Sequence, residues 1–253
     1  RVTFDSTEYC GHCWFCTHGM HNLCAQRRIV GVACTEYRKN GAMAQYIAVK
    51  AHTLYALPAA VSFEQGCLVE PFAVGMHAVL RSGLAAGQTA AVVGDGTIGL
   101  MTLIAAKSQG AQVCISGHHA RPLQLAVRLG ALDAALLPQL TEERGADIVY
   151  DAVGSQSSFA RAMELVRKGG RIMVIGNHAR TIDFPLQRCI TEQIDVQFSY
   201  SSAGEYPVCL QAIAEGRADL TGLWQSFSLE EGPGVFERLI QRDESLTKAI
   251  LIP

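Results

Sequence analysis

The segment Gly94-Asp95-Gly96-Thr97-Ile98-Gly99 constrains the fold of this chain more than any other feature. Its glycines have the spacing G-x-G-x-x-G, an apolar run at 89–93 leads directly into it, and a helical pattern follows. In this arrangement the first glycine permits a tight turn, the second lets the backbone approach a pyrophosphate, and the third allows close helix–strand packing. The helix start offers N–H groups and a positive dipole end to the pyrophosphate. The pattern predicts dinucleotide binding by Gly94, Gly96, Thr97, Ile98 and Gly99, whereas a glycine triplet alone also fits an ordinary turn.

Short apolar runs alternate with helical patterns from about 72 to 202. The runs that we expect to be strands are Thr89–Gly94, Gln112–Ser116, Ala134–Leu137, Asp147–Tyr150, Arg171–Gly176 and Asp195–Tyr200. The expected helices between them are Ile98–Gln109, Arg121–Leu129 and Phe159–Val166. Strands and helices that alternate in this way predict an α/β fold whose doubly wound parallel sheet is covered on both faces.

The second strand of such a unit often ends in an acidic residue that accepts hydrogen bonds from the adenosine ribose of NAD. This chain has Gly117 at that point, followed by His118, His119 and Arg121. Gly117 removes a carboxylate that would repel a 2′-phosphate, and the basic side chains are possible donors to one. The segment therefore favours NADP slightly over NAD, although an exposed loop with unrelated basic residues fits the sequence equally well.

Four of the nine cysteines are clustered as Cys10-x2-Cys13-x2-Cys16-x7-Cys24. Closely spaced cysteines in a reducing compartment indicate metal binding rather than disulfides. Four thiolates form a closed tetrahedral zinc site, which has no open position for chemistry and acts as a structural staple. An iron–sulfur cluster fits less well, because the last spacing differs and no proline follows Cys24. Unrelated redox cysteines are a third interpretation.

Composition and charge limit the partners of the chain. It has 253 residues, of which 49% are hydrophobic and 17% charged, and its formal net charge is 21 − 23 = −2 without long blocks of either sign. This argues against nucleic acid or an anionic membrane as the main partner. No apolar run reaches the roughly 18 residues of a membrane span, and the first residues, 1–5, lack the apolar stretch of a signal peptide. A cytoplasmic location is the expectation.

Together these features resemble the medium-chain dehydrogenase/reductase family, in its zinc-dependent alcohol, polyol and threonine dehydrogenase branch. Besides the cysteines and the glycine turn, the resemblance rests on segments along most of the chain: Gly41-Ala42-Met43-Ala44-Gln45-Tyr46, Leu68-Val69-Glu70-Pro71-Phe72-Ala73-Val74, Asp151-Ala152-Val153-Gly154, Gly169-Gly170-Arg171 and Val174-Ile175-Gly176. It implies a partial GroES-like β domain with the zinc lobe at 1–71, a Rossmann domain at 72–203, and a tail at 204–253 that returns to the first domain.

The resemblance also implies roles for single residues. Glu70 matches an acid beside the catalytic zinc, bound to it directly or through water, although a carboxylate near a helix start is the structural alternative. Val153, Ile175, Gly176, Phe198 and Ser199 match positions near the nicotinamide, although each fits a buried strand end equally well. The family's Cys and Gly-His-Glu ligands of the catalytic zinc have no counterpart here, so we expect an N-terminal segment to be missing.

The function that follows is hydride transfer between NAD(P) and a secondary alcohol of a polyol, sugar or hydroxy amino acid. A zinc-independent reductase of the same fold is one alternative, and a non-catalytic cofactor-binding relative is another. A nucleic-acid-binding zinc ribbon fits poorly, because Cys10–Cys24 lacks interleaved basic and aromatic residues. The resemblance suggests a homodimer or homotetramer built partly through the sixth strand of the Rossmann sheet. The substrate is not specified by the sequence.

Overall fold

A computed structural model describes residues 1–241, 243 and 245–253. Contacts divide the chain into two compact units. The first unit comprises Arg1–Ala73, Ser201–Gly216 and Leu220–Pro253, and the second comprises Val74–Tyr200 and Arg217–Asp219. None of the helices in the described part of the chain is long and apolar enough to cross a membrane.

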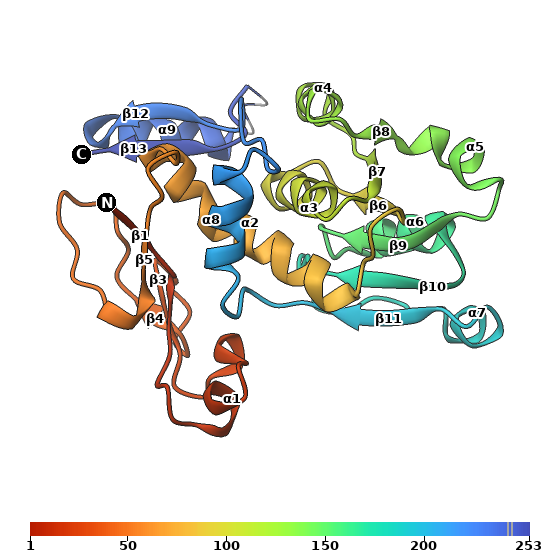
Figure 1. Cartoon of the computed structure of the whole chain (residues 1–253), viewed down its shortest axis with the longest axis horizontal. Helices are drawn as coiled ribbons and strands as arrows, with labels where there is room; N and C mark the ends of the chain where they lie inside the picture. The colour runs from red at the N-terminus through yellow and green to blue at the C-terminus, as the bar shows by residue number, and fades with distance from the viewer. Residues whose placement is uncertain (242, 244) are drawn as a thin grey trace. The chain divides into compact units, whose positions relative to one another are not determined.

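The second unit is built on a six-stranded sheet in the order β11-β10-β9-β6-β7-β8 (Figure 1). Every neighbouring pair in it is parallel. The strands are β6 (Thr89–Val93), β7 (Gln112–Ser116), β8 (Leu132–Asp133), β9 (Ala146–Asp151), β10 (Val166–Val174) and β11 (Asp195–Phe198). This is the strand order of a doubly wound dinucleotide-binding sheet, with the switch point between β6 and β9. The predicted α/β fold and parallel sheet are therefore confirmed.

Helices connect the strands: α3 (Thr97–Ser108), α4 (Ala120–Arg128), α5 (Leu137–Thr141), α6 (Gln156–Leu165) and α7 (Leu186–Thr191). Chain order moves in opposite directions from the switch point, so right-handed crossovers place α3 and α6 on opposite faces of the sheet. Phe159 and Met163 of α6 are buried against Ala91, Val149 and Ile172. Because all six strands are parallel, their carboxyl ends lie along the same side of the sheet.

The predicted strand Ala134–Leu137 is wrong. The strand β8 is shorter and lies earlier, and Ala134–Leu136 form a 3-10 helix that continues into α5. The Asp133 side chain accepts a hydrogen bond from the N–H of Ala135 at 2.8 Å, and Pro138 occupies the first turn of α5. A capping aspartate and an early proline favour helix over strand, and the apolar run gave no sign of this competition.

The described residues of the first unit form three small sheets. The strand β1 (Val2–Phe4) pairs with β5 (Leu54–Ala56), and β12 (Gln225–Ser228) pairs with β13 (Ala249–Ile252). The third sheet consists of β2 (Thr7–Glu8), β3 (Arg28–Val30) and β4 (Arg38–Lys39). The helical segments are α1 (Trp14–Thr17), η1 (His21–Leu23), η2 (Ala51–Thr53), α8 (Tyr206–Ala214), η4 (Leu229–Glu231) and α9 (Gly232–Ile240). Residues 44–49 form no strand, and Tyr46 is 91% exposed.

The helix α2 (Phe63–Ser82) is the longest in the described chain and carries Glu70. A reciprocal pair of hydrogen bonds between Ser62 and Gln65 caps its start. Glu70 therefore lies well inside the helix, one residue before Pro71. The interpretation of Glu70 as a helix-start carboxylate is wrong, because the capping box that sets the helix start lies two turns earlier.

Candidate dinucleotide and metal sites

The three glycines of the turn after β6 meet three different steric demands. Gly94 has φ +110°, a backbone conformation that other residues rarely adopt. A Cβ on Gly99 would lie 1.9 Å from the carbonyl oxygen of Gly94, whereas a Cβ on Gly96 would meet no heavy atom within 4 Å. Gly99 thus packs α3 against the turn, and Gly96 leaves open space at the first turn of α3. An open cradle at a helix N-terminus fits a diphosphate.

Asp151 organises the loop that follows β9. Its carboxylate is buried, and Oδ1 accepts hydrogen bonds from the N–H groups of Val153 and Gly154 at 3.0 and 2.9 Å. Oδ2 accepts from the hydroxyl of Ser158 at 3.1 Å. The sequence analysis gave Asp151 no role, although its place before Ala152-Val153-Gly154 was part of the family resemblance.

The loops after β6, β9 and β10 converge at the edge of the sheet. A Cβ on Gly94 would lie 2.8 Å from a methyl group of Val153, and a Cβ on Gly176 would lie 2.1 Å from the backbone of Val153. Val153 is 36% exposed, and Ile175 and Gly176 are partly exposed. The structure therefore brings these predicted nicotinamide-side residues next to the glycine turn.

Phe198 and Ser199 lie at the end of β11, beside β10. The N–H of Ser199 donates to the carbonyl of Val174 at 2.9 Å. The Phe198 ring is largely exposed, whereas the hydroxyl of Ser199 is buried and has no hydrogen-bond partner among the described residues. A buried hydroxyl without a partner is costly, and a bound polar group would satisfy it. Phe198 and Ser199 therefore lie at the same carboxyl-terminal side of the sheet as the loops after β6, β9 and β10.

The segment after β7 is held by a residue that the sequence analysis did not single out. Asp95, between the first two glycines of the turn, accepts hydrogen bonds from the N–H groups of His118 and His119 at 2.8 and 2.7 Å. His118, His119 and Arg121 are exposed, and Gly117 lies beside the Asp95 side chain. A carboxylate inside a glycine turn was the available signal, but nothing in the sequence showed which segment it contacts.

The four predicted zinc ligands come together in one loop of the first unit. The sulfur atoms of Cys10, Cys13, Cys16 and Cys24 all lie within 4.8 Å of one another. The Sγ–Sγ distances are 3.5 Å for Cys13–Cys16 and 3.9 Å for Cys10–Cys16. A tetrahedral zinc with Zn–S bonds of about 2.3 Å separates its sulfurs by about 3.8 Å, so this set fits the metal.

Backbone N–H groups also point at these sulfurs. The N–H of Cys13 donates to Cys10, and the N–H groups of Cys10 and Gln26 donate to Cys24 at 3.4 Å. A hydrogen bond from the backbone of Cys16, followed by burial that acts the other way, leaves the pKa of Cys13 at about 6. Burial raises the pKa of Cys16 to about 12. The donors favour thiolates, and a bound cation would ionise the buried thiol as well.

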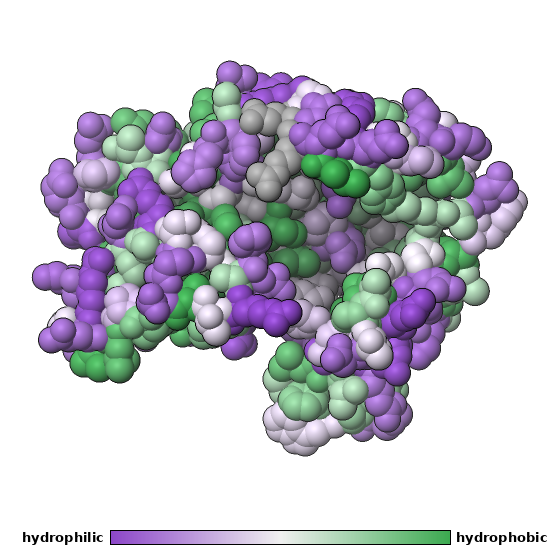
Figure 2. Space-filling view, turned by 180° about the vertical axis from the view of Figure 1, so that it is seen from behind, coloured by the Kyte–Doolittle hydropathy of each residue, from purple (hydrophilic) through white to green (hydrophobic). Residues whose placement is uncertain are grey.

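The lobe that carries the cysteines has little apolar core of its own. Between Cys10 and Cys24 only Cys16, Asn22 and Cys24 are buried, whereas Trp14 is 61% exposed and Phe15 36% exposed. Figure 2 shows this lobe at the bottom of the view with hydrophobic and polar side chains together on its surface. So small a segment gains little order from packing alone, and a metal bound by the four cysteines would supply that order.

Glu70 lies among other carboxylates in the first unit. Its Oε1 accepts a hydrogen bond from the Ser6 hydroxyl at 2.9 Å. Burial and the nearby charges of Glu70 and Glu205 raise the pKa of Asp5 to about 6, against the hydrogen bonds from Thr7. The local negative charge suits a cation. Among the described residues, however, the cysteine cluster is the only set of three or more ligand groups close enough to hold an ion. Glu70 belongs to no such set among the described residues.

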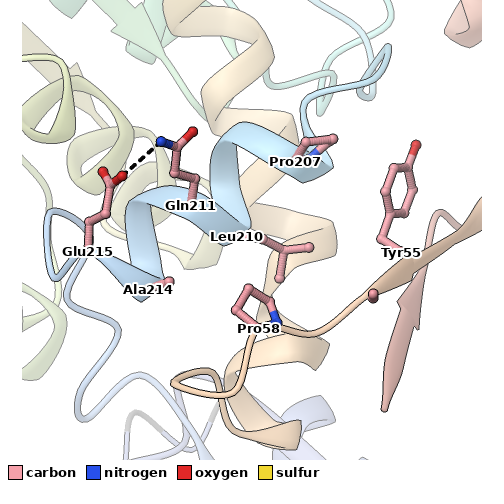
Figure 3. A pocket seen from close by; sticks show the side chains of 8 residues that line it. Tyr55, Pro58, Pro207, Leu210, Gln211, Ala214 and Glu215 are labelled. Carbon is pink, nitrogen blue, oxygen red and sulfur yellow. Dashed lines mark hydrogen bonds between the residues drawn. The ribbon is translucent and has the colours of Figure 1, made fainter.

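A surface pocket of the first unit contains none of the predicted site residues. It has a volume of about 390 Å³ and is lined by Tyr55, Ala56, Pro58, Pro207, Leu210, Gln211, Ala214 and Glu215. Figure 3 shows Gln211 of α8 and Glu215, which directly follows the helix; Nε2 of Gln211 donates to Oε1 of Glu215 at 2.8 Å. The pocket has no cluster of ionisable groups, so we do not assign chemistry to it.

Comparisons with known proteins identify the family of the chain. The family model for the alcohol dehydrogenase GroES-like domain matches residues 1–59, and the model for zinc-binding dehydrogenases matches residues 97–215. The chain is 30% identical to the zinc-type alcohol dehydrogenase-like protein YdjJ of Escherichia coli (strain K12), over 99% of this chain and 74% of that protein. It is 28% identical to the sorbitol dehydrogenase of Bacillus subtilis (strain 168), over 100% of this chain and 74% of that protein.

A solved structure shows the same fold. The alcohol dehydrogenase TADH from Thermus sp. ATN1 superimposes with a TM-score of 0.92 at 24% identity, covering 99% of this chain and 78% of that one. The chain thus spans about three quarters of the length of these proteins. The parallel sheet, the glycine turn and the four-cysteine lobe occur here in one chain that both family models match. The chain belongs to the zinc-dependent alcohol dehydrogenases of the medium-chain dehydrogenase/reductase family and is an NAD(P)-dependent oxidoreductase.

Proposed function

We propose that the protein oxidises a secondary alcohol of a polyol or sugar to the ketone, reversibly, with NADP(H) as the preferred dinucleotide. The observation that carries this proposal is the open cradle at Gly96, at the same sheet edge as the loops of Val153 and Gly176. The polyol class is supported by the similarity to sorbitol dehydrogenase and to the D-arabitol-phosphate dehydrogenase of Enterococcus avium, to which the chain is 30% identical over 96% of its length.

The chain's own residues bind and orient the reactants. In this proposal the N–H groups at the start of α3 bind the diphosphate, with Gly94, Gly96, Thr97, Ile98 and Gly99 as the contacts. Val153, Ile175 and Gly176 border the nicotinamide, and the unpartnered hydroxyl of Ser199 is a donor for a polar group of the cofactor. Phe198 covers the same end of the site. A cofactor held in this way presents its hydride-accepting carbon to the alcohol.

We assign a structural zinc to Cys10, Cys13, Cys16 and Cys24, and we assign Glu70 to a catalytic zinc, as ligand or through water. A catalytic zinc supplies a Lewis acid that lowers the pKa of a bound alcohol. The Ser6 hydroxyl positions the Glu70 carboxylate. We also propose that 1–71 and 204–253 form the catalytic domain and 72–203 the dinucleotide-binding domain. A cytoplasmic location suits the clustered free cysteines.

The substitution Glu70→Gln tests the assigned role of this residue. We expect kcat with the best polyol to fall by about 100-fold, because a neutral amide is a weaker metal ligand. Binding of NADPH stays unchanged, because the glycine turn is intact. The measurement is the change in absorbance of reduced nicotinamide with a panel of polyols and their ketones, together with zinc content. Glu64→Gln, on the same helix, is the matched control.

The result that would contradict the assignment is wild-type turnover in Glu70→Gln. A different result would contradict only the proposed substrate class. If the folded protein binds the dinucleotide but no alcohol or ketone of the panel is converted, the polyol proposal is wrong while the binding site stands.

We further propose a homodimer or homotetramer in which β11 pairs with its copy. This strand ends the sheet, and Phe198 is 65% exposed on it. The amide nitrogen of Ser199 donates to β10, so the alternating geometry of a parallel pair directs the N–H of Val196 to the open edge. Exposed edges of this kind pair with other strands unless they are covered.

Val196→Pro removes that outward N–H. We expect the molecular mass measured by light scattering to fall to half, because proline blocks pairing at an open edge. Val196→Ala, which keeps the N–H, is the control and retains the wild-type mass. An unchanged mass in Val196→Pro would contradict assembly through β11.

A further inference from the structure

The carboxylate of Asp95 occupies the space next to the end of β7. Asp95 is 5% exposed, although it belongs to a turn at the sheet edge. A Cβ built on Gly117 would lie 2.4 Å from Oδ2 of Asp95 and 2.6 Å from its Cβ and Cγ. Contacts this short do not occur between real side chains. Any residue other than glycine at position 117 therefore displaces Asp95.

Both oxygens of Asp95 are already used by the segment after Gly117. Oδ2 accepts from the N–H groups of His118 and His119, and Oδ1 lies 2.9 Å from Nδ1 of His119. Burial disfavours the charged carboxylate, but the hydrogen bonds from His119 and His118 outweigh it, and the pKa of Asp95 lies below its ordinary value. Asp95 is thus an ionised clamp that is satisfied by protein donors.

The position that Asp95 blocks is the one that selects the dinucleotide. Enzymes specific for NAD place an acid at the end of the second strand, where it accepts hydrogen bonds from the ribose hydroxyls and repels a 2′-phosphate. Here the clamp leaves His118 and Arg121 exposed. A pocket of about 170 Å³ opens beside Gly117, and both Asp133 and Arg161 contribute to its wall. The Nε of Arg161 lies 3.4 Å from the Ser116 hydroxyl. Arg161 is the basic side chain of this wall, and the Asp133 carboxylate beside it accepts a hydrogen bond from the N–H of Ala135 at 2.8 Å.

We propose that Asp95 is a specificity-determining residue. Its carboxylate leaves room only for glycine at position 117 and fixes the backbone of residues 117–119, so that the site accepts an adenosine 2′-phosphate. The inference rests on the dinucleotide binding proposed above and deepens it. Asp95 acts as a positioning residue, because its carboxylate contacts protein N–H groups rather than the ribose. Cofactor choice in this chain then depends on the pair of positions 95 and 117.

Calorimetric titration with two cofactor fragments tests the proposal without the nicotinamide or any substrate. The probes are adenosine 2′,5′-bisphosphate and ADP. We expect the wild-type protein to bind the 2′-phosphorylated fragment at least about tenfold more tightly, because phosphates gain charge-assisted hydrogen bonds from basic side chains. Arg121→Ala reduces this preference, whereas Arg128→Ala, at the far end of α4, leaves it unchanged.

Substitutions at the two positions show whether they are coupled. Gly117→Asp alone weakens both fragments, because the new side chain collides with Asp95. Asp95→Ala with Gly117→Asp restores ADP binding and shifts the preference toward ADP by at least about tenfold relative to the wild type. The double variant Asp95→Asn with Gly117→Asp does not restore ADP binding, because asparagine fills the same space as Asp95. The melting temperature of each variant is recorded as a check on folding. If Asp95→Ala fails to fold, ADP binding by the Gly117→Asp and Asp95→Asn variants still tests the proposal.

Two results would overturn the proposal. One is a Gly117→Asp variant that binds ADP as well as the wild type does, since the space is then not blocked. The other is a wild-type preference for ADP that Asp95→Asn abolishes, because Asp95 is then itself a ribose ligand. If the folded wild-type protein binds neither fragment, the dinucleotide function itself fails, and that outcome is distinct from both.

Discussion

Gly96→Val is expected to leave the protein folded and to weaken the binding of NADPH and NADH by at least about 100-fold, which is about 2.7 kcal/mol. The reason is steric. A Cβ at position 96 meets no protein atom within 4 Å, and the backbone there has φ −73°, which valine tolerates. The space that the side chain enters is the cradle in which the diphosphate would lie, so the substitution blocks the ligand and spares the fold.

The matched control is Gly234→Val. A Cβ at position 234 also meets no atom within 4 Å, and Gly234 lies in the first unit, on α9. We expect wild-type affinity for both dinucleotides in this variant. The measurement is fluorescence titration, with melting temperature as the check on folding. Wild-type affinity in Gly96→Val would show that the dinucleotide diphosphate lies elsewhere.

The substitution Cys24→Ser is expected to have the second large effect, on zinc content and on the stability of the fold. Cys24 is fully buried, and two backbone N–H groups donate to its sulfur. We expect the variant to lose the zinc held by the cluster and to be destabilised by at least about 3 kcal/mol, because metal binding supplies the folding free energy of a lobe without a core. The measurements are zinc per chain, thermal unfolding and limited proteolysis of residues 10–24.

Cys34→Ser is the control for that experiment, because Cys34 is an exposed free cysteine outside the cluster. It should keep the zinc and the wild-type melting temperature. Zinc retained in Cys24→Ser, with an unchanged lobe, would contradict the assignment of the four cysteines to one site. Treatment of the wild-type protein with a chelator should reproduce the Cys24→Ser result.

Features of the sequence that act locally predicted the fold well. The glycine triplet between an apolar run and a helix gave the position of β6, the turn and α3, because local backbone geometry requires Gly94 and Gly99 and leaves open space at Gly96. The spacing of the four cysteines predicted a cluster whose sulfurs do lie together. In both cases the residues that determine the structure are neighbours in the chain.

Errors arose where short apolar patterns had more than one solution. Ala134–Leu137 is apolar enough for a strand, but Asp133 and Pro138 direct it into helical turns. The start of α2 depends on the reciprocal bonds of Ser62 and Gln65, so the alternative interpretation of Glu70 as a helix-start carboxylate is wrong.

Polar contacts between residues far apart in the chain could not be predicted from the sequence. Asp95 lies 23 residues from His118, whose N–H it accepts, and only the pairing of β6 with β7 brings the two segments together. The role of Asp151 likewise depends on the bend of the chain after β9. Such residues can be identified as polar and near a motif, but their partners follow from the assembled sheet.

Hydrogen–deuterium exchange in the presence of saturating NADPH tests the central claim most directly. We predict slower exchange of the amides of residues 94–99, because ligand phosphates hydrogen-bond the N–H groups at the start of α3. Folded protein in which saturating NADPH leaves the exchange of these amides unchanged would contradict the account.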